Sequence, residues 1–326
     1  MRSFTLKTGL IAFMALLAAF SGAPSLAQGY PSKQVRLVLG YAPGGGADAL
    51  ARLLATKMTE ISGQQAIVEN RPGASGLLAV QQVATAPADG HTLLVMASSG
   101  VLAQALRTSN THEIERDLSA LSLVAIQPLV LVVNAGSPVQ TVKDFVAQAR
   151  AQPGKTNFGS SGIGGASHLA GELFNLMADV KLFHVPYKGG SESVVAVASG
   201  SIQSTFASTT SIKSLVDAGK LKIIAVTSLQ RTQLSPATPT IAESGIPGYD
   251  AIVWYSVMGP AGVSGELSGQ LNALFNKMVL APEMKEPFVR QGLEPKGSSI
   301  AQLKAMIRNE FVQSQKLIKA ADLKAG

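Results

Sequence analysis

Two glycine-rich turns, each between an apolar run and an apolar helical pattern, most constrain what this 326-residue chain can fold into. The first segment runs from Val35 to Met58 and the second from Thr156 to Met177. In each, a run with strand character ends, glycines crowd the backbone, and a helical pattern begins at once. Such a turn directs unpaired helix N-terminal amides, and the positive end of the helix dipole, toward a ligand. Both turns are therefore predicted to hold an anion, and together they indicate two lobes that share one anionic ligand.

The first turn is expected to present backbone N–H groups and one aromatic ring to this ligand, from Tyr41, Ala42, Gly44, Gly45 and Gly46. The alternative is a tight strand–helix turn that binds nothing. Asp48 leaves two interpretations open, because its carboxylate would repel an anion. It either caps the following helix and turns aside, or it binds an ammonium or hydroxyl group of the ligand.

The second turn offers hydroxyl and amide donors, which bind a carboxylate without a full counter-charge, at Ser160, Ser161, Gly162 and Gly164. His168 falls in the first turn of the next helix, where packing and a backbone hydrogen bond compete with ligand contact. Ser98 and Ser99 end the expected strand Thr92–Met96 and are predicted to line the same cleft.

Strands and helices alternate along the chain, which indicates an α/β fold with largely parallel sheets flanked by helices. Most expected strands are continuous apolar runs, as occurs when helices cover both faces of a sheet. These strands are Val35–Gly40, Thr92–Met96, Leu129–Val133, Phe183–Val185, Ile202–Phe206, Leu221–Val226 and Ile252–Val257. The expected helices are Asp48–Glu60, Leu77–Ala86, Val142–Ala151, Ser193–Ser199, Thr210–Ala218 and Ile300–Ile318.

Two apolar runs, Leu121–Val133 and Ala251–Met258, are expected to be ordered strands that cross between the lobes. Lobe 1 would then be discontinuous and comprise residues 28–127 and 253–326, and lobe 2 would comprise residues 128–252.

The N-terminus is predicted to be a secretory signal peptide of residues 1–27, cleaved after Ala27. Arg2 and Lys7 precede the apolar run Leu10–Phe20, which is too short to span a bilayer. The alternative is an uncleaved N-terminal anchor. The chain has no cysteine, so we expect no lipid attachment, disulfide framework or thiolate metal site. The mature protein is expected to be soluble and exported.

Composition and motifs argue against several other classes of protein. The net charge is +7, to which Arg2 and Lys7 contribute two, and the remaining basic residues are scattered, unlike a nucleic-acid surface. There is no P-loop, and no Gly-x-Ser-x-Gly occurs at the second turn. A dinucleotide fingerprint fails because Ser167 stands where its third glycine would be. The four histidines lack metal-site spacing, so we expect neither a metal nor a cofactor.

The chain resembles the extracytoplasmic solute-binding proteins of tripartite tricarboxylate transporters, the Bug proteins. The resemblance rests on an ordered set of segments over nearly the whole mature chain: YPSKQVRLVLGYAPGGGADALAR, VENRPGASG, DGHTLLVMASS, TVKDFVAQARAQPGKTNFGSSGIGGASHLAGELF, VPYKGG, SGSIQSTFAS, GKLKIIAVTSLQR, PTIAESGIPGYDAIVWYSVMGPAG and LEPKGSS. One departure is Ala42-Pro43-Gly44-Gly45, where the family pattern is Pro-Pro-Gly-Gly. Losing one proline would loosen the turn slightly and keep the glycine amides.

This resemblance implies a type II periplasmic binding protein fold that closes over a small carboxylate and delivers it to a membrane permease. Ala207 and Ser208 resemble the family's ligand loop in the second lobe. The implied protein is a periplasmic receptor, expected to be a monomer, and not an enzyme. A sensor of the same fold that docks to a membrane histidine kinase stays open as an alternative, as does, with less support, an enzyme. The ligand's class, an aliphatic di- or tricarboxylate, an aromatic acid or an amino acid, is left open by the residues.

Overall fold

The computed structural model describes residues 30–44, 46–73, 76–107 and 112–320. The predicted signal peptide and Gly45 therefore lie outside the described residues. The strands are β1 (Val35–Leu39), β2 (Ala66–Asn70), β3 (Thr92–Ala97), β4 (Leu118–Asn134), β5 (Asn157–Ser160), β6 (Phe183–Pro186), β7 (Ser204–Ser208), β8 (Leu221–Val226), β9 (Ile252–Pro260) and β10 (Glu294–Pro295). The helices are α2 (Gly46–Ser62), α3 (Leu77–Ala84), α4 (Ser99–Ala105), α5 (Ile114–Asp117), α6 (Val142–Ala151), α7 (Ala166–Ala178), α8 (Gly190–Ala198), α9 (Thr209–Asp217), α10 (Gly265–Val279), α11 (Lys285–Arg290), α12 (Ile300–Ala320) and the 3₁₀ turn η3 (Pro282–Met284).

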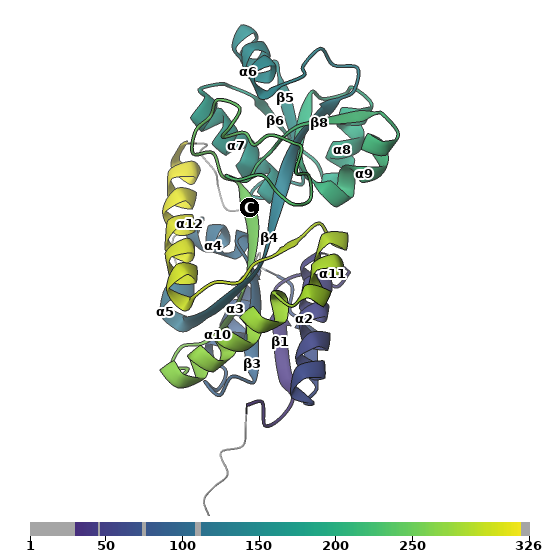
Figure 1. Cartoon of the computed structure of the whole chain (residues 1–326). Helices are drawn as coiled ribbons and strands as arrows, with labels where there is room; N and C mark the ends of the chain where they lie inside the picture. The colour runs from purple at the N-terminus through teal and green to yellow at the C-terminus, as the bar shows by residue number, and fades with distance from the viewer. Residues whose placement is uncertain (1–29, 45, 74–75, 108–111, 321–326) are drawn as a thin grey trace, which may run out of the picture.

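The molecule is elongated, and its two ends are joined by strand β4, which runs through the middle (Figure 1). Residues 118–128 of β4 pair with β9, and residues 129–134 pair with β7 on one side and β8 on the other. We call the part built on β1, β2, β3, β9, β10 and the first stretch of β4 half A. Half B is built on β5, β6, β7, β8 and the second stretch of β4.

The sheet is parallel away from the crossing strands and antiparallel along them. In half A, β1 pairs in parallel with β2 and β3, and in half B, β5 pairs in parallel with β6 and β7. Strands β4 and β9 make only antiparallel pairs. The α/β fold class is confirmed, but the largely parallel character holds only for the outer strands. Strand β9 returns to half A from half B, so it runs in the direction opposite to its neighbours β3 and β4.

Each half has a core on both faces of its sheet, which explains the continuous apolar runs. In β1, Leu37 packs on one face with α2, α10 and α11, whereas Val38 packs on the other with α3, α4 and α12. In β4, Leu131 and Val132 face the two cores of half B in the same alternating way. Helix α12 packs against both α4 of half A and α7 of half B, and Figure 1 shows it along one side of the molecule.

The expected elements are found with shifted ends. The strand expected at Ile202–Phe206 is β7 at Ser204–Ser208, and the strand expected to end at Met96 ends at Ala97. Ser98 and Ser99 therefore follow that strand, and Ser99 opens α4, which the sequence analysis did not expect. In the described ranges, no helix is both long and apolar enough to cross a membrane.

Candidate functional site

The register of the crossing strands brings two loop-bearing sheet edges toward one another. Ala97, at the end of β3, lies opposite Tyr255 of β9, which in turn lies opposite Ala125 of β4. Ser208, at the end of β7, lies opposite Leu129 of β4. Leu129 lies four positions after Ala125 along β4, which is ~13 Å at about 3.3 Å per residue. Because β1 runs parallel to β3 and β5 to β7, both glycine-rich turns open at these edges.

Asp48 holds the first turn together from the first turn of α2. Its Oδ2 accepts from the Gly44 N–H at 3.0 Å and from Arg52 Nε at 2.8 Å, and its Oδ1 accepts from Asn70 Nδ2 at 2.9 Å. The Asn70 amide also donates to the Tyr41 carbonyl at 3.0 Å. Asp48 is only 3% exposed. The hydrogen bond from Arg52, followed by those from Gly44 and Asn70, lowers the pKa of Asp48 to about 2 despite its desolvation.

This network bears on the two interpretations of Asp48. Both carboxylate oxygens bond to the protein itself, as expected of a residue that caps and turns aside. Its direct contact with ligand stays a prediction.

The rest of the first turn is fixed by a close backbone approach and by one hydroxyl pair. A Cβ on Gly40 would meet the backbone of Gly76 at 2.5 Å, so glycine is required where these loops touch. The Tyr41 hydroxyl lies 2.7 Å from Ser99 Oγ and links the first turn to the start of α4. Burial raises the pKa of Tyr41, which keeps this phenol protonated. Tyr41 and Ser99 are therefore in contact, and their binding of ligand stays a prediction.

Some backbone donors at the edge of half A have no acceptor among the described residues, whereas others are engaged. Within the described part of the chain, no acceptor takes the N–H of Tyr41 or Ala42. The Ser98 N–H, in contrast, donates to the Trp254 carbonyl at 2.9 Å, and Ser98 is 7% exposed. Gly44 is likewise engaged, by Asp48. Of the predicted ligand residues here, Tyr41, Ala42, Gly46 and Ser99 have an N–H that no described residue accepts.

The second turn uses most of its own amides internally. The Gly162 N–H donates to Ser160 Oγ at 3.1 Å, and the Ser161 N–H donates to Ser167 Oγ at 2.9 Å. The Gly164 N–H donates to His168 Nδ1 at 3.0 Å, and the Gly165 N–H to the Gly162 carbonyl at 3.2 Å. Among the described residues, no acceptor takes the N–H of Ile163 or of Ala166, which opens α7. These two amides are donors that the sequence analysis did not single out.

His168 lies behind the second turn. It is 3% exposed, and its ring stacks on His184 of β6 with centroids 3.9 Å apart. Ser160 is fully buried, and its Oγ lies 2.6 Å from His184 Nε2. A serine so close to a histidine resembles a nucleophile and its base. Among the described residues, the one carboxylate within ion-pair distance of these rings is that of Glu172. It lies 3.7 Å from His168 and not beside His184, so it does not orient His184 as the third member of a catalytic triad would.

The third loop at these edges follows β7. Ala207 is buried in the β4–β7 pairing, and Ser208 caps α9 by accepting from the Ser211 N–H at 3.4 Å. Thr209 opens α9, and its N–H has no acceptor among the described residues. The signal that could have identified Thr209 and Ala166 is their place as the first helical residue after a predicted ligand turn.

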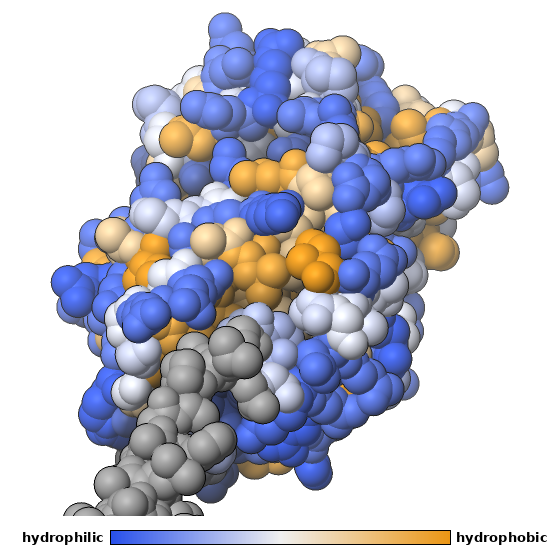
Figure 2. Space-filling view, turned by 60° about the horizontal axis from the view of Figure 1, so that its bottom comes forward, coloured by the Kyte–Doolittle hydropathy of each residue, from blue (hydrophilic) through white to orange (hydrophobic). Residues whose placement is uncertain are grey.

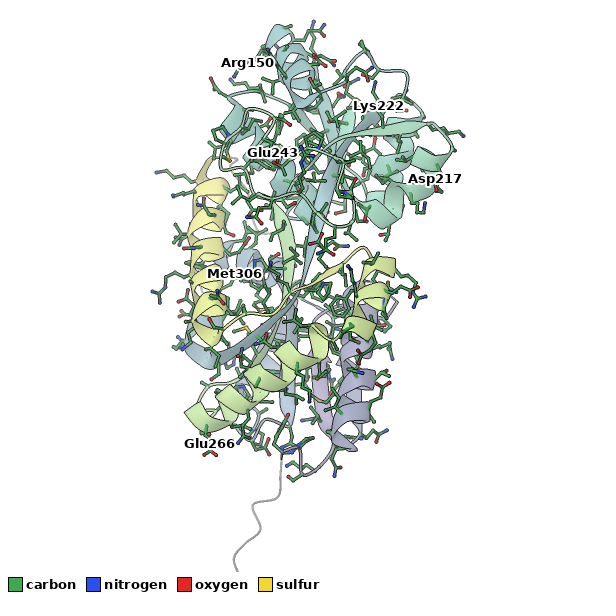
Figure 3. The ribbon with its side chains drawn as sticks, viewed as in Figure 1. Arg150, Asp217, Lys222, Glu243, Glu266 and Met306 are labelled. Carbon is green, nitrogen blue, oxygen red and sulfur yellow. The ribbon has the colours of Figure 1, made fainter. Side chains whose placement is uncertain are left out.

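A small pocket lies beside the first turn and is lined by Gly40, Tyr41, Gly76, Val80, Leu94, Val95, Met96 and Gly100. A cavity of about 540 Å³ opens beside edge strand β2 and α3 and is lined by Asn70, Arg71, Pro72, Leu78, Gln81, Gln82 and Thr85. None of the residues that line this cavity is a predicted ligand residue. Figure 2 shows apolar surface gathered across the middle of the face it presents, with hydrophilic surface on both sides. Arg150 and Glu266 lie at opposite ends of the molecule, and Asp217 lies at the outer surface of half B (Figure 3).

Sequence comparison agrees with this architecture. A family model described as tripartite tricarboxylate transporter family receptor matches residues 50–323. The chain belongs to this receptor family. The family membership inferred from the ordered sequence segments is thereby confirmed. Receptors of the family are periplasmic solute-binding proteins and not enzymes, as expected from the resemblance.

Relatives match over most of their length. A UPF0065 protein in the tcbD-tcbE intergenic region of Pseudomonas sp. (strain P51) is 36% identical over 290 residues, 89% of this chain and 86% of the relative. BugT of Bordetella pertussis is 32% identical over 308 residues, 93% of this chain and 94% of BugT.

Solved structures show the same fold. A TctC solute-binding protein from Polaromonas, without ligand, has a TM-score of 0.80 at 26% identity over 89% of this chain and 99% of that one. Rpa4515 of R. palustris, solved with adipate, has a TM-score of 0.74 at 31% identity, over 90% of this chain and 99% of that one.

Proposed function

We propose that this receptor binds a small carboxylate between the facing edges of halves A and B and delivers it to the permease of a tripartite transporter. The observation that carries the proposal is that backbone donors without acceptors among the described residues occur at both edges. They include Tyr41 and Ala42 in half A, and Ile163, Ala166 and Thr209 in half B. Two of these residues open helices, where the dipole favours negative charge. The adipate in the related Rpa4515 supports a dicarboxylate as the first candidate.

Halves A and B correspond in this proposal to lobes 1 and 2, with boundaries at residues 127/128 and 252/253. The carboxylate would favour the closed arrangement because it contacts both lobes at once. We further propose that the chain acts in the periplasm as a monomer, after cleavage behind Ala27.

The expected affinity follows from the donors. Each hydrogen bond to a charged group contributes roughly 1.5–3 kcal/mol net. About four of them sum to roughly 6–12 kcal/mol, and association costs of at least about 4 kcal/mol leave no more than about −8 kcal/mol, which is micromolar binding or weaker. Such an affinity suits a receptor that must also release its cargo.

A thermal-shift screen tests carboxylate binding. The mature protein, stripped of ligand, is measured with adipate, malate, citrate, aromatic acids and acidic amino acids, each beside its uncharged amide. A ligand at one hundred times its Kd stabilises by about 2.7 kcal/mol, a shift of several degrees. We expect an acid to respond and its amide not to. Equal responses to acid and amide, or silence across all acids, would contradict the proposal.

One backbone donor can be removed without losing the helix. Proline is tolerated at the first position of a helix and lacks an N–H. In Ala166→Pro the preceding residue, Gly165, already has the extended conformation that a following proline requires, with φ −72° and ψ 160°. We expect the affinity for the responding acid to fall by about 10- to 100-fold, since one bond to a charged group is lost.

The matched control is Gly265→Pro. Gly265 opens α10 after an extended Ser264, at φ −59° and ψ 152°, and a Cβ there meets nothing within 4 Å. This variant should bind the acid as the wild type does. If both variants bind normally and are folded, the Ala166 amide is not a ligand donor.

A further inference from the structure

Two stacked imidazoles lie under the second turn. His168 comes from α7 and His184 from β6, with ring centroids 3.9 Å apart and an interplanar angle of 26°. Phe158 of β5 stacks on His184 at 5.0 Å and lies parallel to His168 at 6.4 Å. We call His168 and His184 the histidine pair.

Each member of the histidine pair ends a hydrogen-bond chain that begins at a glycine amide of the turn. His168 Nδ1 accepts directly from the Gly164 N–H at 3.0 Å. His184 Nε2 lies 2.6 Å from Ser160 Oγ, which accepts from the Gly162 N–H at 3.1 Å. The pair therefore fixes the two amides on either side of Ile163, whose own N–H stays available.

The bond from Gly164 determines the protonation state of His168. A ring nitrogen that accepts an N–H carries no proton, so the proton of neutral His168 lies on Nε2. Nε2 lies 3.7 Å from Glu172 Oε1, on the side away from the turn. If Nδ1 also carried a proton, its N–H and the Gly164 N–H would be two donors that face each other, with the nitrogens at the present 3.0 Å.

The surroundings of the pair favour the neutral form. Burial, and then the charge of His184, lowers the pKa of His168 to about 4, and burial lowers the pKa of His184 as well. Phe158 of β5 and Phe206 of β7 face this region.

The nearby carboxyl groups do little to offset this. Burial raises the pKa of Glu172 on α7. Helices α7 and α12 also pack together, but Glu310 of α12 bonds to Trp254 Nε1 of β9 at 3.1 Å, and burial raises its pKa too.

We propose that the histidine pair positions the second turn for ligand, so that protonation of the pair in acid rearranges the turn and weakens carboxylate binding. The role rests on the proposed function, since the turn is a ligand site only there. The pair acts through Gly162 and Gly164 and does not itself touch the ligand. Protonation of His168 at Nδ1 removes the acceptor of the Gly164 N–H, so the first protonation already breaks the arrangement. A second protonation would place two repelling imidazolium rings 3.9 Å apart.

The experiment compares the wild type with two variants of His168. In His168→Asn the side-chain oxygen can still accept from Gly164 but does not titrate, whereas His168→Leu has no acceptor. His112→Gln is the control: its Nδ1 lies 3.3 Å from Asp117 Oδ2 in half A, remote from the turn.

The first readout is nuclear magnetic resonance of the ligand-free protein, which does not depend on the proposed function. In the wild type and in His112→Gln, the amide signals of Gly164 and Gly162 should shift with the same midpoint as the His168 ring. In His168→Asn the Gly164 signal should stay constant over that range, whereas the Gly162 signal, linked through Ser160 to the intact His184, can still shift with His184. Constant amide signals in the wild type while the ring titrates would overturn the proposal.

The second readout is the affinity for adipate and malate as a function of pH. Wild-type affinity should fall about tenfold per pH unit below the His168 midpoint, because one proton competes with binding. His168→Asn should not show this loss of affinity. Because the acid itself titrates identically in both experiments, the comparison between the two proteins removes its contribution. His168→Leu should bind at least tenfold more weakly at pH 7. Identical pH profiles of wild type and His168→Asn would overturn the proposal.

Failure of the two proposals can be told apart. If no acid binds at any pH, the proposed function fails, while the amide titration still decides whether the pair holds the turn.

Discussion

Removing the charge of Asp48 is the sharpest test of how the first turn is built. Asp48→Asn keeps the size of the side chain but leaves one acceptor oxygen in place of a carboxylate that accepts from Gly44, Arg52 and Asn70. The new amide NH₂ replaces one acceptor oxygen by a donor, and this donor faces Gly44, Arg52 or Asn70, which are themselves donors. At least one of the Gly44 and Asn70 donors must then lose its partner in a site that is 3% exposed at Asp48.

The magnitude follows from these contacts. A buried donor left without its partner costs about 1–3 kcal/mol. Arg52 is more than half exposed, so the loss of its ion pair adds little to this cost. We expect Asp48→Asn to lower the free energy of unfolding by about 2–3 kcal/mol, or Tm by about 4–12 °C for a chain of this size.

Differential scanning calorimetry measures the effect, with Asp217→Asn as the matched control. Asp217 also pairs four residues along a helix, with Lys213 at 2.7 Å, but its side chain is 61% exposed at the outer surface of half B (Figure 3). Such pairs contribute about 0.3–0.5 kcal/mol. Equal losses of stability in the two variants would refute the role given to Asp48.

The pH dependence of this effect has a definite sign. The pKa of Asp48 is about 2 in the folded protein, below the ordinary value of 3.8. A lowered folded-state pKa contributes stability that is present above pH ~4 and lost as pH falls toward 2. The difference between wild type and Asp48→Asn should therefore shrink over that interval. A difference that is constant from pH 5 to pH 2 would contradict the assigned ionisation.

Two further pairs of variants test packing. Gly171→Ala should destabilise by about 1–3 kcal/mol, because its Cβ would overlap the Phe158 ring. Gly269→Ala in α10 should stabilise by about 0.5–1 kcal/mol, because a Cβ there meets nothing within 4 Å and alanine has the higher helix propensity. Thermal unfolding measures both, and a neutral Gly171→Ala would contradict the packing. Glu310→Ala should cost about 1–3 kcal/mol because the buried indole N–H of Trp254 loses its acceptor. Glu310→Gln should keep most of the stability because its side-chain oxygen can still accept this bond. Urea unfolding followed by tryptophan fluorescence decides this, and equal losses in both variants would argue against the bond.

Much of the fold could be predicted because strand and helix patterns are local properties of the sequence. Apolar runs gave β1, β3, β8 and β9, and glycines marked the turns that follow β1 and β5. Strand β2 was missed because its five residues are half-buried and end in a glutamate and an asparagine. Helix α10 was missed because glycines at 265 and 269 interrupt its pattern.

The candidate site was harder to predict because its contacts join residues far apart in the chain. The glycine turns were identifiable, but which of their amides stay available depends on Asp48, Asn70 and His168. Asn70 reaches the first turn only because β2 pairs with β1. His184 reaches Ser160 only because β6 pairs with β5. No spacing in the sequence encodes these neighbours.

The crystal structure of the mature protein with the acid that responds most strongly tests the central claim most directly. The account predicts carboxylate oxygens within about 3.2 Å of backbone N–H groups from both halves, at Tyr41 or Ala42 on one side and at Ile163, Ala166 or Thr209 on the other. An acid bound to one half only, or in the cavity beside β2 and α3, would contradict it.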